Sequence, residues 1–120
     1  MESQKKQGIL ARVQNSLRGI LCAVQTEGSI RLHVVGWVVL AVLGFTLGFS
    51  ITDWRWVCFA TTIAFVVELL NTALEDVCDM YSKEYHPMIK RIKDVASGAV
   101  LVSTLACLGV VVSVVYPFFR

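Results

Sequence analysis

The sequence predicts an all-α integral membrane protein, in which an amphipathic surface helix is followed by three transmembrane helices. Of the 120 residues, 56% are hydrophobic and 17% are charged, whereas a soluble domain carries about 25% charged residues. Residues 32–52 and 95–119 contain no Asp, Glu, Lys or Arg, and each run is long enough for a helix to cross a hydrocarbon core of about 30 Å. We therefore expect residues 1–120 to form a single membrane domain.

Residues 9–28 are expected to form the surface helix. Apolar side chains recur there at helical spacing, with Arg and Gln side chains between them. Such a helix buries its apolar face among lipid headgroups and keeps its polar face in water. Glu27, Gly28 and Ser29 follow the pattern, and glycine tolerates unusual backbone angles, so we expect the chain to turn there into the first span.

The first transmembrane helix is predicted over residues 32–50. Gly44 and Gly48 form a GxxxG pattern in it, which lets another helix approach closely. Thr52 and Asp53 are expected to form a short external turn before the second span.

The second transmembrane helix is predicted over residues 54–80, although it carries acidic residues in its second half. Glu68, Asn71, Glu75 and Asp79 follow one another at steps of three, four and four residues. At about 100° per residue, these side chains fall within about 80° of one another on the helix. Three carboxylates and an amide therefore form one polar stripe, which climbs from the membrane interior toward one surface.

The third transmembrane helix is predicted over residues 95–116, after a loop dense in charge. Pro87 disfavours a helical conformation at the residue before it, so we expect a helix to restart after Pro87 and to continue into the span. Small side chains at residues 96–99 open this span and would let another helix or a substrate approach closely.

The distribution of Lys and Arg predicts the orientation in the membrane. Nine of the eleven basic residues precede the first span or lie between the second and the third. These nine are Lys5, Lys6, Arg12, Arg18, Arg31, Lys83, Lys90, Arg91 and Lys93. The positive-inside rule then places the N-terminus in the cytoplasm and the C-terminus outside. We expect no cleavable signal peptide, because the N-terminal segment is amphipathic rather than uniformly apolar.

The polar stripe is the first candidate site, because an ionisable side chain inside a membrane helix costs about 2.5–3.5 kcal/mol. Glu68 is deep enough to accept the proton of a lipid hydroxyl. Glu27 and Glu75 could share Mg²⁺ bound to nucleotide phosphates, and Lys93 offers a positive charge for those phosphates. Each residue taken alone also has a structural interpretation, such as a hydrogen bond between helices for Glu68 or Asn71.

The segments ELLNTALEDVCD and KEYHPMIKRIKDVASGAV together resemble the signature of the small bacterial membrane lipid kinases, the diacylglycerol and undecaprenol kinases. The resemblance covers nearly the whole chain. It implies an ATP-dependent, diacylglycerol kinase-type enzyme that transfers the γ-phosphate to a membrane alcohol and yields phosphatidic acid or undecaprenyl phosphate. It also implies Mg²⁺ as cofactor, a homotrimer with active sites shared between subunits, and the bacterial cytoplasmic membrane as location. No common nucleotide-binding motif is present, so ATP rests on the resemblance.

The resemblance implies roles for particular residues. Glu68 would be the catalytic base, and Glu27 and Glu75 would bind both the metal and ATP. The other residues implied at the nucleotide are Glu84, Tyr85, His86, Lys93 and Asp94. The residues implied at the lipid substrate or in support of the stripe are Asn71, Asp79 and Ser97.

His33 bears on the choice of lipid. The diacylglycerol-specific branch of the family has a carboxylate at this position, and His33 together with the segment at residues 84–87 resembles the undecaprenol kinase branch. We therefore favour undecaprenol over diacylglycerol and keep both open. His33 could equally be a neutral residue with satisfied hydrogen bonds at the end of its span.

Two functions of other classes compete with the kinase. Carboxylates inside membranes also mark ion paths, as in a proton-coupled small membrane transporter or a channel subunit. Residues 56–67 contain only Thr61 and Thr62 as polar groups, so no continuous polar path crosses the second span. A purely structural assembly protein would use the GxxxG pattern and would leave the polar stripe without a purpose.

Overall fold

The protein is built from helices alone over residues 8–120, which a computed structural model describes. The elements are α1 (Ile9–Thr26), α2 (Gly28–Leu47), α3 (Ile51–Tyr81), α4 (Pro87–Val115) and the short 3₁₀-helix η1 (Tyr116–Phe118). No strand occurs in this part of the chain, which confirms the all-α prediction. Lys5 and Lys6, which contribute to the predicted orientation, lie outside the described residues.

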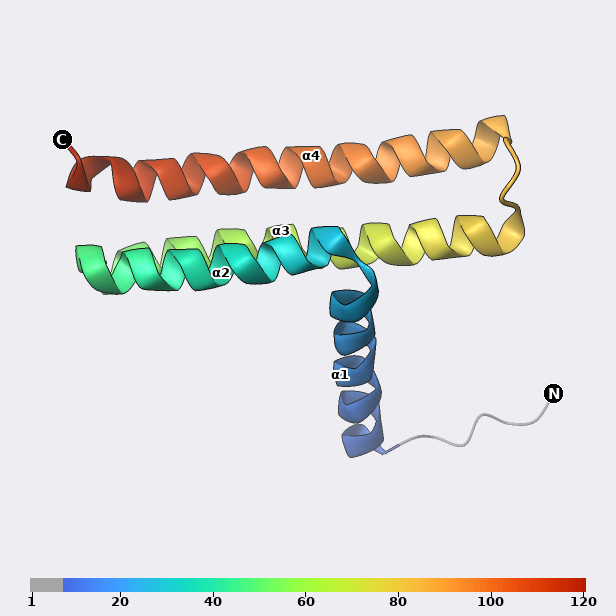
Figure 1. Cartoon of the computed structure of the whole chain (residues 1–120), viewed down its shortest axis with the longest axis horizontal. Coiled ribbons are helices and arrows are strands. Elements are labelled where there is room, and N and C mark those ends of the chain that lie inside the picture. Colours follow the sequence, from blue (N-terminus) through green and yellow to red (C-terminus); the bar gives the residue numbers. More distant parts are fainter. Residues whose placement is uncertain (1–7) are drawn as a thin grey trace.

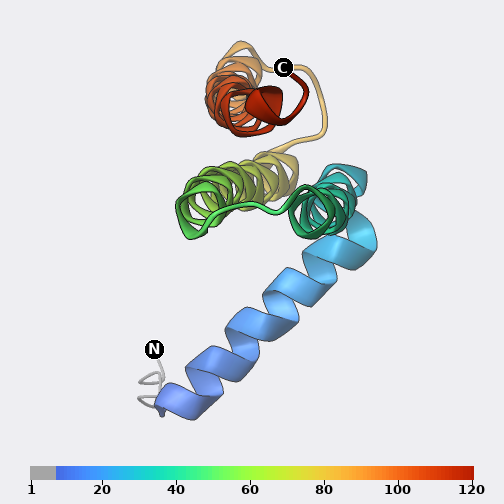
Figure 2. The same ribbon diagram turned by 90° about the vertical axis from the view of Figure 1, so that its left-hand side faces the viewer.

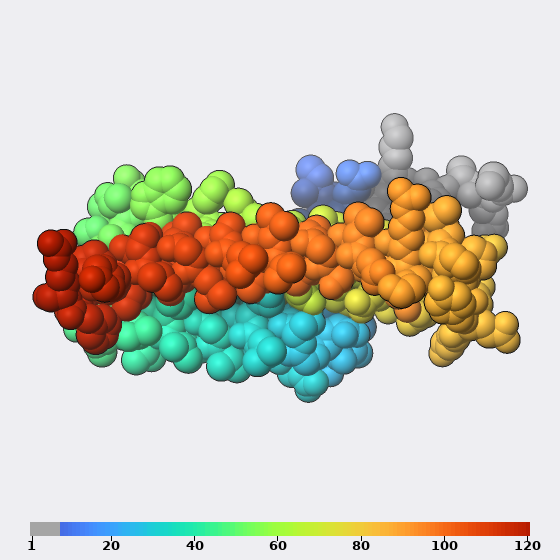
Figure 3. Space-filling model, turned by 90° about the horizontal axis from the view of Figure 1, so that it is seen from above, coloured from blue at the N-terminus to red at the C-terminus, as the bar shows by residue number. Residues whose placement is uncertain are grey.

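Helices α2, α3 and α4 run alongside one another, while α1 crosses them (Figures 1 and 2). A tight loop returns the chain from α3 into α4, so that these two helices form a long antiparallel pair. Seen from the face that α4 covers, α2 and α3 emerge on its two sides along half of the molecule (Figure 3). Helix α1 meets the others part-way along α3, so the last turns of α3 and the first turns of α4 extend beyond it.

Three helices are long and apolar enough to cross a membrane, as predicted. Helix α2 has 20 residues and is therefore about 30 Å long, which matches a typical hydrocarbon core. Helices α3 and α4 have 31 and 29 residues, which gives each of them about 45 Å. Each of these two helices thus exceeds the core thickness by about 15 Å.

The turn between α2 and α3 differs from the prediction. It lies at residues 48–50, because Gly48 adopts a left-handed conformation with φ of 76° and ends α2. Ser50 and Asp53 then form a capping box, in which each side chain accepts a hydrogen bond from the other residue's backbone N–H. This reciprocal cap satisfies two helix-end donors, so Thr52 and Asp53 belong to the first turn of α3 instead of an external turn.

The two glycines of the GxxxG pattern have different roles. Gly44 is buried, and a Cβ atom there would overlap the indole ring of Trp54 from α3. It therefore supports a close approach of α2 and α3, as the pattern predicts. The expectation for Gly48 was wrong, because this residue ends the helix and no neighbour lies within 4 Å of the position of its Cβ.

Packing within residues 8–120 concentrates in two small apolar clusters rather than one core. One joins Ala23 of α1, Ile30 of α2 and Phe65 of α3, and the other joins Val57 of α3 to Val114 of α4. Many large apolar side chains are exposed on all four helices. This surface suits lipid, in which apolar side chains need no burial.

Candidate functional site

The residues of the polar stripe become less buried along α3, from Glu68 toward the α3–α4 loop. Glu68 and Asn71 are only 6% and 9% exposed, whereas Glu75 is half-buried and Asp79 is exposed. The junction of α1 and α2 packs on α3 near Phe65, so the α3–α4 pair extends beyond it. The stripe therefore leads from a closed interior to an open end.

Asn71 lies between Glu68 and Glu75 on the stripe and contacts Glu75. Its Nδ2 donates a hydrogen bond of 3.2 Å to Oε1 of Glu75, one helical turn away. Its Oδ1 is buried, and no donor among residues 8–120 reaches it. A buried acceptor without a partner costs free energy, so this oxygen is available to a group outside the described chain.

Glu68 lies at a hollow of about 470 Å³ between α2, α3 and α4. His33 and Trp37 of α2 and Thr104 and Cys107 of α4 share this hollow with Glu68. The two ion pairs among residues 8–120 join Lys90 to Asp94 and Lys93 to Asp79, so no described cation pairs with Glu68. A carboxylate without a charge partner in an apolar hollow is suited to act on a group that enters it.

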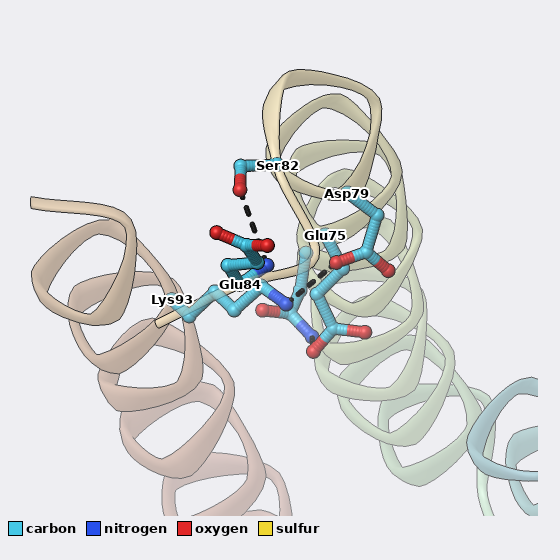
Figure 4. A network of polar contacts seen from close by, with 6 residues as sticks. Glu75, Asp79, Ser82, Glu84 and Lys93 are labelled. Carbon is cyan, nitrogen blue, oxygen red and sulfur yellow. Dashed lines mark hydrogen bonds and ion pairs between the residues drawn. The ribbon is translucent and has the colours of Figure 1, made fainter. Parts of the chain in front are cut away.

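An ion pair connects the open ends of α3 and α4. Nζ of Lys93 donates a hydrogen bond of 2.8 Å to Oδ1 of Asp79, across fourteen residues of sequence (Figure 4). Exposed pairs of this kind contribute little to stability. Lys93 has three donor hydrogens, so its ammonium group can contact Asp79 and a phosphate oxygen together.

The loop residues predicted at the nucleotide also shape the loop. The backbone N–H of Glu84 donates to Oγ of Ser82 over 3.1 Å, and Nδ1 of His86 caps α4 by accepting from the N–H of Met88. Pro87 occupies the first turn of α4, where its missing N–H costs nothing. A new helix was predicted after Pro87, and the structure begins this helix at Pro87 itself. Figure 4 shows Glu84 on the loop that joins the helix of Asp79 to the helix of Lys93.

The remaining predicted residues are spread more widely. Glu27 is the single residue between α1 and α2. Leu69 packs with the cluster at this junction, and Glu75 lies six residues further along α3, about 9 Å along its axis. Tyr85 is 79% exposed and Ser97 is exposed as well. Asp94 pairs with Lys90, four residues before it on the same helix.

Sequence reasoning did not place Thr104 and Cys107 of α4 beside Glu68. The contact between Asp79 and Lys93 shows the register of the antiparallel pair. Glu68 lies eleven residues before Asp79, and Thr104 lies eleven residues after Lys93. Pairing the opposite charges of Asp79 and Lys93 in the sequence would therefore have placed Thr104 opposite Glu68.

The sequence of this chain matches those of known proteins over most of its length. Residues 14–115, which include the whole stripe and the α3–α4 loop, match the family described as prokaryotic diacylglycerol kinase. The chain belongs to this family. The family relationship makes it a lipid kinase embedded in a membrane, and neither a transporter nor an assembly protein is favoured.

Two relatives within the lipid kinase family show its range of acceptors. The undecaprenol kinase of Bacillus subtilis (strain 168) is 34% identical over 92 residues, which cover 76% of this chain and 75% of the relative. The diacylglycerol kinase of Pseudomonas aeruginosa is 37% identical over 103 residues, which cover 82% of this chain and 84% of the relative. A third relative, the diacylglycerol kinase of Escherichia coli (strain K12), is 29% identical over 90 residues, or 75% of this chain and 74% of the relative. Membership thus implies a nucleotide co-substrate and a lipid alcohol.

Proposed function

We propose that this lipid kinase uses ATP and transfers its γ-phosphate to a polyprenol, undecaprenol being favoured over diacylglycerol. The observation that carries the proposal is Glu68, an unpaired carboxylate at an apolar hollow and at the buried end of a polar stripe that opens toward Lys93. A lipid hydroxyl can approach from the hollow, and a nucleotide can approach from the open end. Both substrates then meet on one face of α3.

If α1 lies on the membrane surface, Glu68 is at a depth that both a lipid hydroxyl and a nucleotide phosphate can reach. Helix α1 crosses the other helices (Figures 1 and 2) and packs near Phe65 and Leu69. From Ile51, Leu69 is eighteen residues along α3, or about 27 Å, close to the thickness of the hydrocarbon core. Glu68 would then lie at the level of the headgroups, and Glu75 and Asp79 would lie in water.

The reaction follows from these positions. The oxygen of the lipid hydroxyl forms a bond to the γ-phosphorus of ATP, and Glu68 accepts the proton of that hydroxyl. The bond from the γ-phosphorus to the β–γ bridging oxygen breaks, and ADP leaves with the electron pair. Lys93 neutralises phosphate charge during the transfer, and Glu84, Tyr85, His86 and Asp94 are proposed to hold the nucleotide near the loop. Ser97 is proposed to lie near the lipid.

The donor set suits a Mg²⁺ ion. Mg²⁺ prefers oxygen ligands and keeps several waters, so it needs few protein ligands. Glu75 offers a half-buried carboxylate, and the unpaired Oδ1 of Asn71 lies one turn away on the same stripe. We propose that Glu75 and Glu27 hold Mg²⁺ together with the nucleotide phosphates. The ion would supply positive charge to the transferring phosphoryl group.

The surroundings of the enzyme are part of the proposal. The basic residues support a cytoplasmic N-terminus in a bacterial cytoplasmic membrane, where ATP is available. A homotrimer with shared active sites is proposed as the assembly. The exposed apolar faces of α2, α3 and α4 support it, because they offer surface to neighbouring subunits.

The decisive experiment follows labelled γ-phosphate from ATP into extracted lipid, with undecaprenol and diacylglycerol as parallel acceptors. We expect label in both lipids, with the higher kcat/KM for undecaprenol. Label that appears in neither lipid would refute the proposed function, and a higher kcat/KM for diacylglycerol would refute the preferred acceptor. Omission of Mg²⁺ in the same assay tests the metal.

A further inference from the structure

A second hollow continues the hollow that contains Glu68. It has a volume of about 320 Å³ and lies between α2 and α3. Trp37, Leu40 and Thr61 line both hollows, so the two hollows lie next to each other at these residues. The combined groove begins at Glu68 and reaches Trp54, near the start of α3.

The junction of the two hollows is suited to hydrocarbon. Thr61 is buried there, but its hydroxyl donates back to the carbonyl of Val57 over 2.8 Å, within its own helix. A satisfied hydroxyl leaves no unpaired donor toward the groove. The ring of Trp37 packs on that of Phe65, with centroids 4.7 Å apart, and forms part of the wall of both hollows.

The groove is longer than one leaflet of a bilayer. Trp54 lies fourteen residues before Glu68 on α3, which corresponds to about 21 Å along the axis. One leaflet contributes half of a hydrocarbon core of about 30 Å, or about 15 Å. An acyl chain that starts at Glu68 and stays in its own leaflet would therefore end before the groove does.

We propose that the second hollow is a chain-end subsite, which binds the distal part of a polyprenol chain whose hydroxyl lies at Glu68. This inference rests on the proposed lipid kinase function and deepens it. The occupant follows from continuity with the carboxylate, from the apolar junction and from a length that crosses the bilayer midplane. Ala41 and Cys58, which face the second hollow from α2 and α3, then determine how long a chain the enzyme accepts.

The expected selectivity has a packing origin. A chain in the membrane is already surrounded by hydrocarbon, so transfer into the groove gains no hydrophobic free energy. The gain comes from contacts in a shaped groove, and contacts remote from the reacting group can be used to orient the hydroxyl. A change of one or a few methylene groups in such a pocket alters kcat/KM by roughly tenfold or more.

The test fills the second hollow without touching Glu68. Ala41→Trp is compared with the wild type and with Val42→Trp, a matched change at an exposed position of α2 outside the hollow. The acceptors are undecaprenol, the short isoprenoid alcohol farnesol, and diacylglycerol. We expect Ala41→Trp to lower kcat/KM for undecaprenol at least about tenfold and to leave both shorter acceptors within about twofold, as Val42→Trp does for all three.

The short acceptors also report on folding. If Ala41→Trp loses activity on farnesol as well, Cys58→Phe is tested instead, because it fills the same hollow from α3. The subsite predicts that Cys58→Phe lowers the ratio of undecaprenol activity to farnesol activity. An unchanged ratio of undecaprenol to farnesol activity would overturn the subsite. Equal losses on all acceptors together with altered sedimentation would also overturn it and would assign the hollow to a neighbouring subunit. A wild-type enzyme that phosphorylates none of the alcohols would instead refute the proposed function.

Discussion

Replacement of Glu68 by Gln is expected to lower phosphate transfer by a factor of about 10²–10⁴, the usual contribution of a positioned general base. This factor corresponds to a loss of about 2.7–5.4 kcal/mol of transition-state stabilisation, at about 1.36 kcal/mol for each tenfold change. The structural cost should be far smaller. Gln has nearly the same shape, and neither ion pair among residues 8–120 includes Glu68, so no buried partner loses its counter-charge.

The assay measures transfer of labelled γ-phosphate to undecaprenol under saturating ATP, with the wild type, Glu68→Gln and Asp76→Asn in parallel. Asp76 lies on the same helix but is exposed and outside the polar stripe, so Asp76→Asn should remain within about twofold of the wild type. Thermal unfolding in detergent checks that both variants are folded. The assignment of the base is refuted if Glu68→Gln keeps most of the wild-type kcat, or if Asp76→Asn loses as much activity.

Four further outcomes follow from the structure. Lys93→Ala should raise the KM for ATP in steady-state kinetics by roughly tenfold, as expected for a lost charged hydrogen bond. The control Lys90→Ala should change this KM little, because Lys90 pairs with Asp94 outside the stripe. Equal effects of the two variants would contradict a specific role for Lys93. Asn71→Leu should lower kcat/KM for ATP by roughly tenfold in the same assay, and unchanged kinetics would mean that its unpaired Oδ1 has no ligand. Gly44→Ala should lower stability by about 1–3 kcal/mol through overpacking against Trp54, seen as a lower melting temperature, unless the indole ring can move aside. Chelation of divalent cations should abolish transfer, added Mg²⁺ should restore it, and activity that survives chelation would exclude the metal.

The polar stripe is the part of the site that the sequence predicted best. Its spacing placed Glu68, Asn71, Glu75 and Asp79 on one face of one helix, and a contact inside α3 agrees, because Asn71 donates to Glu75. Helical periodicity is a local property, so spacing alone was sufficient. The assignment of each residue to a catalytic or binding role stays a prediction.

The helix ends could be predicted only in part. Pro87 marks the start of α4 because its fixed backbone angle and missing N–H suit a first helical turn. The end of α2 was placed too late, because Gly48 reads equally well as a packing glycine and as a helix terminator. The φ of 76° at Gly48 shows that this residue ends the helix. The capping box at Ser50 then begins α3.

The sequence by itself determined the number of long apolar helices and the face of α3 that carries the carboxylates, because these depend on composition and on 3.6-residue periodicity. Only the tertiary structure decided what surrounds Glu68. The packing of α3 on α4, in the register that the Asp79–Lys93 contact shows, brings Thr104 to the same hollow, and Gly44 permits the close approach of α2. Such contacts join residues far apart in the chain, so no local pattern specifies them. The groove from Glu68 to Trp54 exists only once three helices lie in one register.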